Sequence, residues 1–146
     1  MSKKPEFLFD FVVRHSWHRI SRMYNQKAAE HGMTMSIGFL LMSVDKEGTP
    51  STQLGPKMGM EPTSLSRTLK TMEERNLIRR EEDLSDKRKV LIFLTEKGIE
   101  QRKMVKNFVI GFNDQIFNKI PKSKMNAFFE VAEKVDLLIE EEMKKI

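Results

Sequence analysis

The chain has no cysteine among its 146 residues. This excludes disulfides, a cysteine-ligated zinc site and a thiol-based redox switch. It also has no apolar run near the ~18 residues that cross a bilayer. The first residues, MSKKPEFLFDF, are a poor secretory signal because charged side chains interrupt them. We therefore expect a cytoplasmic protein without a membrane partner.

Residue patterns typical of catalysis are missing as well. The sequence contains no glycine-rich phosphate loop and no Ser-His-Asp candidate set. His15 and His18 stand three positions apart on a predicted helix, a spacing that a metal ion can bridge. No cysteine supports them, and His31 lies beyond the helix end, so ordinary exposed or hydrogen-bonded histidines are the favoured interpretation. We expect no enzyme activity, no metal site and no cofactor.

The charge is moderately basic, with 26 Lys and Arg, 21 Asp and Glu, and a formal net charge of +5. This is compatible with nucleic-acid binding but does not establish it. The excess is not a broad patch, because residues 61–97 combine nine basic with eight acidic side chains. If DNA is the partner, local clusters must carry the binding.

Hydrophobic periodicity predicts a mainly helical single domain, residues 1–146, with one small β-hairpin. A stripe of apolar residues every three or four positions marks a long first helix, and the second helix is apolar nearly all round. The expected helices are 7–30, 34–46, 49–58, 61–75, 95–118 and 122–143, and the expected strands are 77–82 and 89–94.

Several residues predict where these elements begin and end. Thr34 and Thr95 are expected to cap helices, and Thr49-Pro50-Ser51 to start one. Gly59 and Asn76 are expected to end helices in the left-handed conformation. Pro56 should leave the helix 49–58 short or kinked. The middle elements, residues 34–97, are arranged as a winged helix-turn-helix, and the outer helices are too apolar to be additions to so small a unit.

The segment EPTSLSRTLKTMEER, residues 61–75, has the composition of a helix that reads DNA. Leu65, Leu69 and Met72 lie within about 60° of one another on a helical wheel and should face inward. The opposite side carries hydroxyls and cations, which can reach phosphates and base edges in a major groove. The alternative is an ordinary solvated helix face. The candidate DNA-binding residues of this helix are Thr63, Ser64, Ser66, Arg67 and Lys70.

The segment DKRK, residues 86–89, lies at the predicted hairpin tip. Lys87, Arg88 and Lys89 could enter a minor groove, where a narrow A·T-rich groove attracts arginine. Asp86 would repel phosphate, so we interpret it as an intramolecular anchor that orients Arg88. The alternative is that the lysines protect an edge strand from aggregation.

These motifs resemble the core signature of the MarR family of bacterial transcription regulators. The family's recognition-helix exit, wing Asp-x-Arg and Leu-Thr-x-x-Gly have counterparts in residues 72–78, 86–88 and 94–98. The flanking helices also match in order and length. Asn76 in place of the usual Gly, and Pro56, are departures.

The resemblance implies a homodimer in which residues 5–31 and 98–146 form dimerisation helices, and a palindromic operator. It also implies a repressor that responds to a small, often aromatic, effector. Some family members sense peroxides through cysteine, and this mechanism is excluded here because the chain has no cysteine. The candidate effector-pocket residues are His15, Trp17, His18 and Met42, with Met35 beside them, although such residues on helical stripes are usually core.

Two alternatives to a DNA-binding regulator remain open from the sequence. The first is a protein-interaction module that uses the winged fold as a scaffold and does not contact DNA. Such a module would need neither Arg67 nor the basic tip at residues 87–89. The second is an RNA-binding protein, which is weaker because no aromatic stacking surface is evident.

Overall fold

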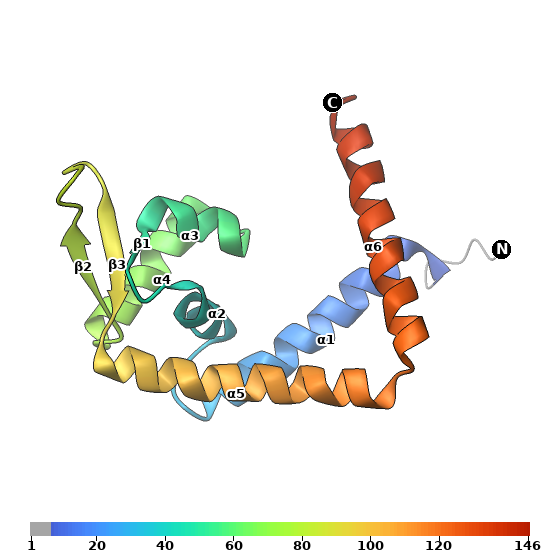
Figure 1. Ribbon diagram of the computed structural model, residues 1–146, viewed down its shortest axis with the longest axis horizontal. Helices are drawn as coiled ribbons and strands as arrows, with labels where there is room; N and C mark the ends of the chain where they lie inside the picture. Colours follow the sequence, from blue (N-terminus) through green and yellow to red (C-terminus); the bar gives the residue numbers. More distant parts are fainter. Residues whose placement is uncertain (1–6) are drawn as a thin grey trace. The chain divides into compact units, whose positions relative to one another are not determined.

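The structure, a computed structural model, describes residues 7–146, so residues 5 and 6 of the expected first dimerisation helix lie outside the described part. It is mainly helical with a small antiparallel sheet, which confirms the predicted fold class (Figure 1). The elements are α1 Phe9–Ala29, α2 Met35–Ser43, β1 Thr49–Pro50, α3 Ser51–Met58, α4 Pro62–Glu74, β2 Ile78–Glu82, β3 Val90–Leu94, α5 Glu96–Lys119 and α6 Lys122–Met143.

The chain divides into two compact units, and the boundary falls inside α5 after Lys106. The first unit holds α1 to α4, the sheet and the start of α5; the second holds the rest of α5 and α6. Within the second unit, the ring centroids of Phe117 and Phe129 lie 6.4 Å apart, which joins its two helices. The single domain 1–146 and its subdivision stay predictions.

Both predicted threonine caps are confirmed. The Thr34 hydroxyl accepts a hydrogen bond from the backbone N–H of Ile37 at 3.2 Å. The Thr95 hydroxyl accepts one from the backbone N–H of Gly98 at 3.0 Å. Each bond satisfies an N–H group that the first turn of a helix leaves without an intrahelical partner.

The predicted left-handed helix ends are also confirmed. Gly59 follows α3 with φ 62°, and Asn76 follows α4 with φ 60°. Helix α3 contains Pro56 and is only eight residues long, as expected. Helix α2, however, ends at Ser43, three residues earlier than the predicted Lys46.

We predicted that Thr49-Pro50-Ser51 starts a helix. This prediction was wrong for Thr49 and Pro50, which form the short strand β1. Thr49 pairs with Ile92 and Pro50 with Leu91, which gives a three-stranded sheet in the order β1-β3-β2. Thr49 is fully buried, and its hydroxyl accepts the backbone N–H of Asp45 at 2.8 Å. Proline is tolerated because β1 is an edge strand.

The hydrophobic core lies in the first unit, between α2, α3, α4 and the sheet. The side chains of Leu40, Leu41 and Val44 at α2 are fully buried, as are Leu54 of α3 and Ile92 of β3. Helices α1 and α6 contain no buried residue. The core therefore supports the helix-turn-helix and the hairpin, while α1 and α6 leave apolar side chains exposed.

Candidate nucleic-acid interface

Helix α4 presents a polar face and packs with an apolar one. Leu65, Leu69 and Met72 are buried, as predicted, and Pro62 stands in its first turn, where a missing N–H costs nothing. Five predicted DNA-binding residues are all exposed on this helix: Thr63, Ser64, Ser66, Arg67 and Lys70. This face follows from the helical spacing of the apolar residues.

The two cations of this face are free to meet a ligand. Within residues 7–146, neither Arg67 nor Lys70 has an ion-pair partner. The hydroxyls of Thr68 and Thr71 instead bond to carbonyl oxygens of their own helix, Ser64 at 2.9 Å and Arg67 at 3.2 Å. Those two threonine hydroxyls therefore already donate within the helix, and the five predicted residues are among the exposed groups that remain available to a partner.

The C-terminal end of α4 is held by side chains from distant segments. The Arg75 guanidinium donates to the carbonyl oxygen of Gly32 in the α1–α2 loop. The Lys97 ammonium donates to the Arg75 carbonyl at 3.1 Å, and the Thr95 hydroxyl to the Asn76 carbonyl at 2.6 Å. The start of α5 thus satisfies carbonyls that the end of α4 leaves open.

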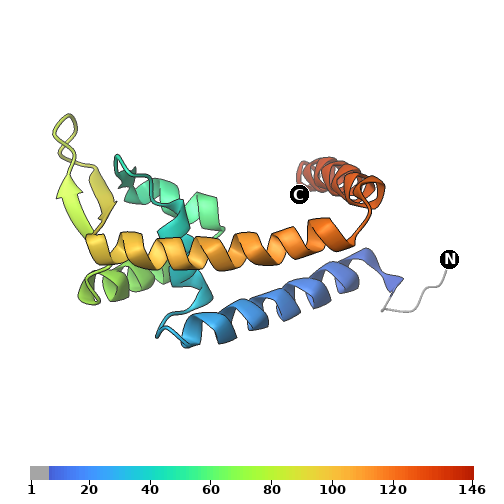
Figure 2. The same ribbon diagram turned by 60° about the horizontal axis from the view of Figure 1, so that its bottom comes forward.

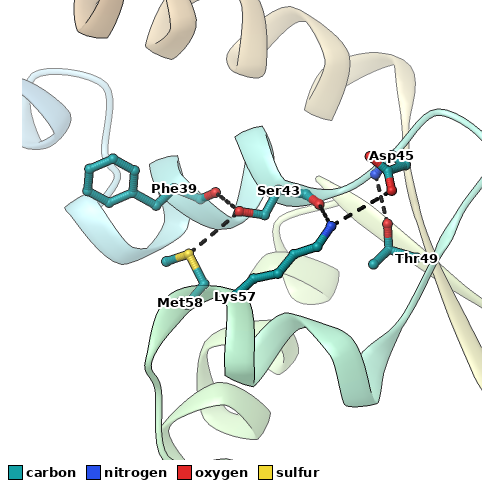
Figure 3. A network of polar contacts seen from close by, with 6 residues as sticks. All are labelled: Phe39, Ser43, Asp45, Thr49, Lys57 and Met58. Atoms are coloured by element: carbon teal, nitrogen blue, oxygen red, sulfur yellow. Dashed lines mark hydrogen bonds and ion pairs between the residues drawn. The ribbon is translucent and has the colours of Figure 1, made fainter. Parts of the chain in front are cut away.

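The preceding helix, α3, is fixed to the end of α2 by polar contacts (Figure 3). The Ser43 hydroxyl donates to the Phe39 carbonyl at 2.8 Å and lies 3.6 Å from the sulfur of Met58. The Lys57 ammonium donates to the Ser43 carbonyl at 3.4 Å and lies 3.8 Å from a carboxylate oxygen of Asp45. These contacts, with the buried Leu54 of α3, position the first helix of the helix-turn-helix.

The loop between β2 and β3, residues 83–89, is the wing tip, and it projects away from the helices of the first unit (Figures 1 and 2). The backbone N–H of Asp83 donates to the Lys89 carbonyl at 3.1 Å, and that of Lys89 to the Asp86 carbonyl at 3.0 Å. The Asp83 carboxylate accepts the Ser85 hydroxyl at 2.7 Å and the Ser85 N–H at 2.9 Å. These Ser85 bonds hold the pKa of Asp83 below its ordinary value.

The predicted anchor and the predicted groove residue are adjacent. Asp86 Oδ1 accepts the backbone N–H of Arg88 at 3.0 Å and lies 3.4 Å from Arg88 Nε. The Asp86 side chain is 34% exposed, whereas that of Arg88 is 92% exposed. Lys87 and Lys89 are exposed as well. The role of Asp83 was not predicted from the sequence, although an Asp two residues before a hydrogen-bonding serine is typical of a turn.

The four candidate effector residues do not form one enclosed cavity. His15 and His18 lie on α1, beside a surface hollow of about 300 Å³ lined by Phe11, Arg14, His15 and His18. The rings of Phe11 and His15 stack at 6.0 Å. Trp17 is exposed on α1, and Met42 is half-buried on α2; neither lines this hollow.

Three buried polar atoms of the first unit lack a hydrogen-bond partner among the described residues: Ser21 Oγ, Gln101 Oε1 and Arg102 Nε. Ser21 lies one turn before Tyr24, whose ring meets Phe39 of α2 at 5.7 Å. The other two lie one turn before Val105 of α5, whose side chain packs on Gly38 of α2. Unpaired buried polar atoms are rare, and no sequence pattern predicts these three.

Two further features are absent from residues 7–146. No group of three or more His, Asp or Glu side chains could hold a metal ion. No helix in that range is long and apolar enough to cross a membrane.

The chain is similar to known proteins in the segment that contains the helix-turn-helix and the hairpin. The MarR family model matches residues 33–90. The HTH-type transcriptional regulator SarZ of Staphylococcus epidermidis is 29% identical over 120 residues, which is 82% of this chain and 76% of SarZ. The HTH-type transcriptional regulator TtmR of Methylorubrum extorquens is 32% identical over 89 residues, 60% of this chain; the chain spans 46% of the length of TtmR.

Two solved structures share the fold. The S. aureus MepR–DNA complex superposes with a TM-score of 0.81 at 19% identity, covering 89% of this chain and 97% of MepR. CouR of Rhodococcus jostii RHA1, bound to p-coumaroyl-CoA, superposes with a TM-score of 0.80 at 23% identity, covering 92% and 95%. The family match, the relatives and the fold agree: in its helix-turn-helix and hairpin the chain is similar to transcriptional regulators of the MarR family.

Proposed function

We propose that the protein is a ligand-responsive repressor that binds a palindromic double-stranded DNA operator as a homodimer. The observation that carries this proposal is the pair of neighbouring cationic elements in the first unit. The exposed face of α4 carries Arg67 and Lys70, neither of which pairs with an acidic side chain within residues 7–146, and the wing tip carries the exposed Arg88. Acting on DNA, the protein would work in the cytoplasm.

Helix α4 is the recognition helix in this proposal. An α-helix fits the major groove, and an arginine there can pair with two acceptors of a guanine. Arg67 is assigned this base contact, while Thr63, Ser64, Ser66 and Lys70 are assigned to phosphates and base edges. The buried Leu65, Leu69 and Met72, and the bonds at the C-terminal end of α4, support the helix from behind. A rigid support reduces the entropy lost on binding.

The wing tip is assigned to the adjacent minor groove. Arg88 supplies the guanidinium, and Lys87 and Lys89 supply charge for the phosphates on either side. Asp86 bonds to the backbone and side chain of Arg88, which is the contact expected of an anchor. Its negative charge is thereby offset within the tip rather than directed at phosphate.

Homodimerisation is supported by the apolar side chains that the two outer helices leave exposed. Soluble monomers rarely expose many large apolar side chains together. A second copy would cover them and would present two winged units to an inverted repeat. The exposed residues are Phe9, Phe11, Val12, Val13 and Trp17 of α1, and Phe128, Phe129, Val131, Leu137, Leu138, Ile139 and Met143 of α6.

A ligand response is supported by the unpaired buried atoms of Ser21, Gln101 and Arg102, which a polar ligand group could satisfy. The hollow beside His15 and His18 is a second candidate place for an effector. The structure of CouR, a relative in fold, contains p-coumaroyl-CoA. We therefore propose a small aromatic effector for this chain, with the first unit as its binding region.

The decisive experiment is selection of duplexes from random DNA, followed by affinity measurements on the selected sequence and on a random one across a salt series. A repressor of this kind should enrich an inverted repeat and lose affinity steeply with salt. A scaffold module that does not contact DNA would enrich nothing. Release of the selected duplex in a screen of aromatic acids and their thioesters would then test the effector.

A further inference from the structure

The wing tip carries one apolar side chain that the basic residues do not explain. Leu84 is 102% exposed, so its side chain touches nothing else in the described chain. Among the exposed large apolar side chains of residues 7–146, this value is matched only by Ile146, at 105%. The apolar residues of the adjoining strand β3 are all buried or half-buried. A fully solvated leucine in the middle of a structured loop is therefore unusual.

The loop holds Leu84 outward rather than leaving it free to fold back. Asp83, on one side of it, accepts two hydrogen bonds from Ser85, on the other side. The loop is closed again between Asp83 and Lys89 and between Asp86 and Lys89. Fixing these backbone groups in advance lowers the entropy that a contact at the tip would cost.

The charge around Leu84 indicates what it meets. The tip carries three cations and two carboxylates, and both carboxylates already accept hydrogen bonds, from Ser85 and from Arg88. The cations are exposed on the same short loop. An apolar group flanked by exposed cations fits a surface with apolar walls and phosphate edges, which describes a DNA minor groove lined by deoxyribose.

We propose that Leu84 is an apolar DNA contact, which packs against the sugar walls of the minor groove next to Arg88. This inference rests on the proposed function and adds a residue to its wing. Leucine is among the side chains that proteins use for apolar minor-groove contacts. Because a narrow A·T-rich groove brings the two sugar walls together, Leu84 should favour A·T flanks through shape rather than charge.

The test compares three variants on the duplex selected from random DNA: Leu84→Ser, Leu84→Met as the control that keeps an apolar side chain, and Arg88→Ala. Affinity is measured by fluorescence anisotropy across a salt series. Leu84→Ser should bind about tenfold more weakly, because the apolar area it would bury is lost. Its log K against log salt slope should match wild type, since no phosphate contact is removed. Leu84→Met should bind like wild type.

The salt slope separates this contact from simple disruption of the wing. Leu84→Ser affinity equal to that of wild type overturns the inference, and so does a Leu84→Ser slope reduced like that of Arg88→Ala. Unfolding temperatures should be the same for wild type and Leu84→Ser, because the side chain is solvated in the free protein. If wild type itself binds no duplex, the proposed function fails first. If wild type binds the duplex and Leu84→Ser binds it equally well, only the proposed role of Leu84 fails.

Discussion

Gly98, in the first turn of α5, lies directly against the backbone of Leu77. A β-carbon placed on Gly98 would lie 2.1 Å from the Leu77 carbonyl oxygen. That oxygen also accepts the backbone N–H of Thr95 at 3.1 Å. The junction between the end of α4, the sheet and α5 is therefore packed backbone against backbone. This close packing is the physical reason for glycine at position 98, the last residue of the Leu-Thr-x-x-Gly motif.

Gly98→Ala should lower the free energy of unfolding by at least about 2 kcal/mol, because the new methyl group must displace the Leu77 carbonyl and its bond to Thr95. Urea unfolding followed by circular dichroism measures this. Gly111→Ala, later in α5, is the matched control, since its β-carbon would meet nothing within 4 Å. That control should be neutral or more stable by up to about 1 kcal/mol. Equal stability of the two variants would refute the packing argument.

Much of the fold could be predicted because its signals are local. Thr34, Gly59 and Asn76 act through their own backbone or near neighbours, and the spacing of Leu65 and Leu69 alone defines the inner face of α4. Strand β1 was missed because two residues carry no periodicity. It exists through pairing with β3, about 40 positions away in the chain, and that pairing overrides the local preference of Thr-Pro-Ser for a helix start.

The features of the candidate site also divide into local ones, which the sequence predicts, and long-range ones, which it does not. Asp86 and Arg88 are neighbours, so their contact could be foreseen from the sequence. The bond from Arg75 to Gly32 joins residues 43 positions apart, and no local pattern indicates it. The unpaired atoms of Ser21 and Arg102 likewise depend on how separate helices pack. Long-range packing, rather than residue type, determines these features.

Arg67→Ala should cost about 1–3 kcal/mol of operator binding and relax discrimination at one base pair per half-site, because the bidentate contact to guanine is lost. Arg67→Lys is the informative companion variant: it keeps the charge and hence the salt slope, but cannot form the two parallel bonds. Anisotropy titrations on the selected duplex and its single-base variants measure both effects. If Arg67→Ala weakens selected and random duplexes equally, Arg67 contacts phosphate instead.

The protein should be a dimer at micromolar concentration, with a mass twice the 17.1 kDa of the chain, because a partner must cover the apolar faces of α1 and α6. Light scattering over a dilution series measures the mass. The half-site centres of the selected inverted repeat should then lie about one helical turn apart, ~10 bp. A stable folded monomer would contradict the dimer, and enrichment of a single half-site would contradict the palindrome.

Asp83 should titrate below its ordinary pKa of 3.8, because the Ser85 hydroxyl and N–H both stabilise the carboxylate. Folding lowers this pKa, so the stabilising contribution is complete above 3.8 and is lost as the pH falls through the folded value. The side-chain carbonyl ¹³C shift of Asp83 measures the midpoint. Ser85→Ala removes the hydroxyl bond and should raise the pKa of Asp83 toward 3.8. An unchanged midpoint in that variant would show that the hydroxyl is not the cause.

Arg88→Ala should weaken binding on every duplex and most on A·T-rich flanks, because a narrow groove concentrates the negative potential that attracts the guanidinium. The magnitude of the log K against log salt slope should fall by about one for each contact removed, hence by about two for a dimer. Titrations across a salt series on duplexes that differ only in their flanks provide the measurement. An unchanged slope would remove the wing from the interface.

Asp86→Ala sets two physical effects against each other. Removing a negative charge near phosphate should tighten binding by electrostatics alone. The anchor, however, holds the Arg88 backbone at 3.0 Å, and without it the tip must lose more conformational entropy when it enters the groove. We expect the ordering cost to dominate, because the carboxylate is already offset by Arg88, so the variant should bind more weakly. Tighter binding than wild type across the same salt series would mean that Asp86 acts only as a charge, and would end the anchor hypothesis.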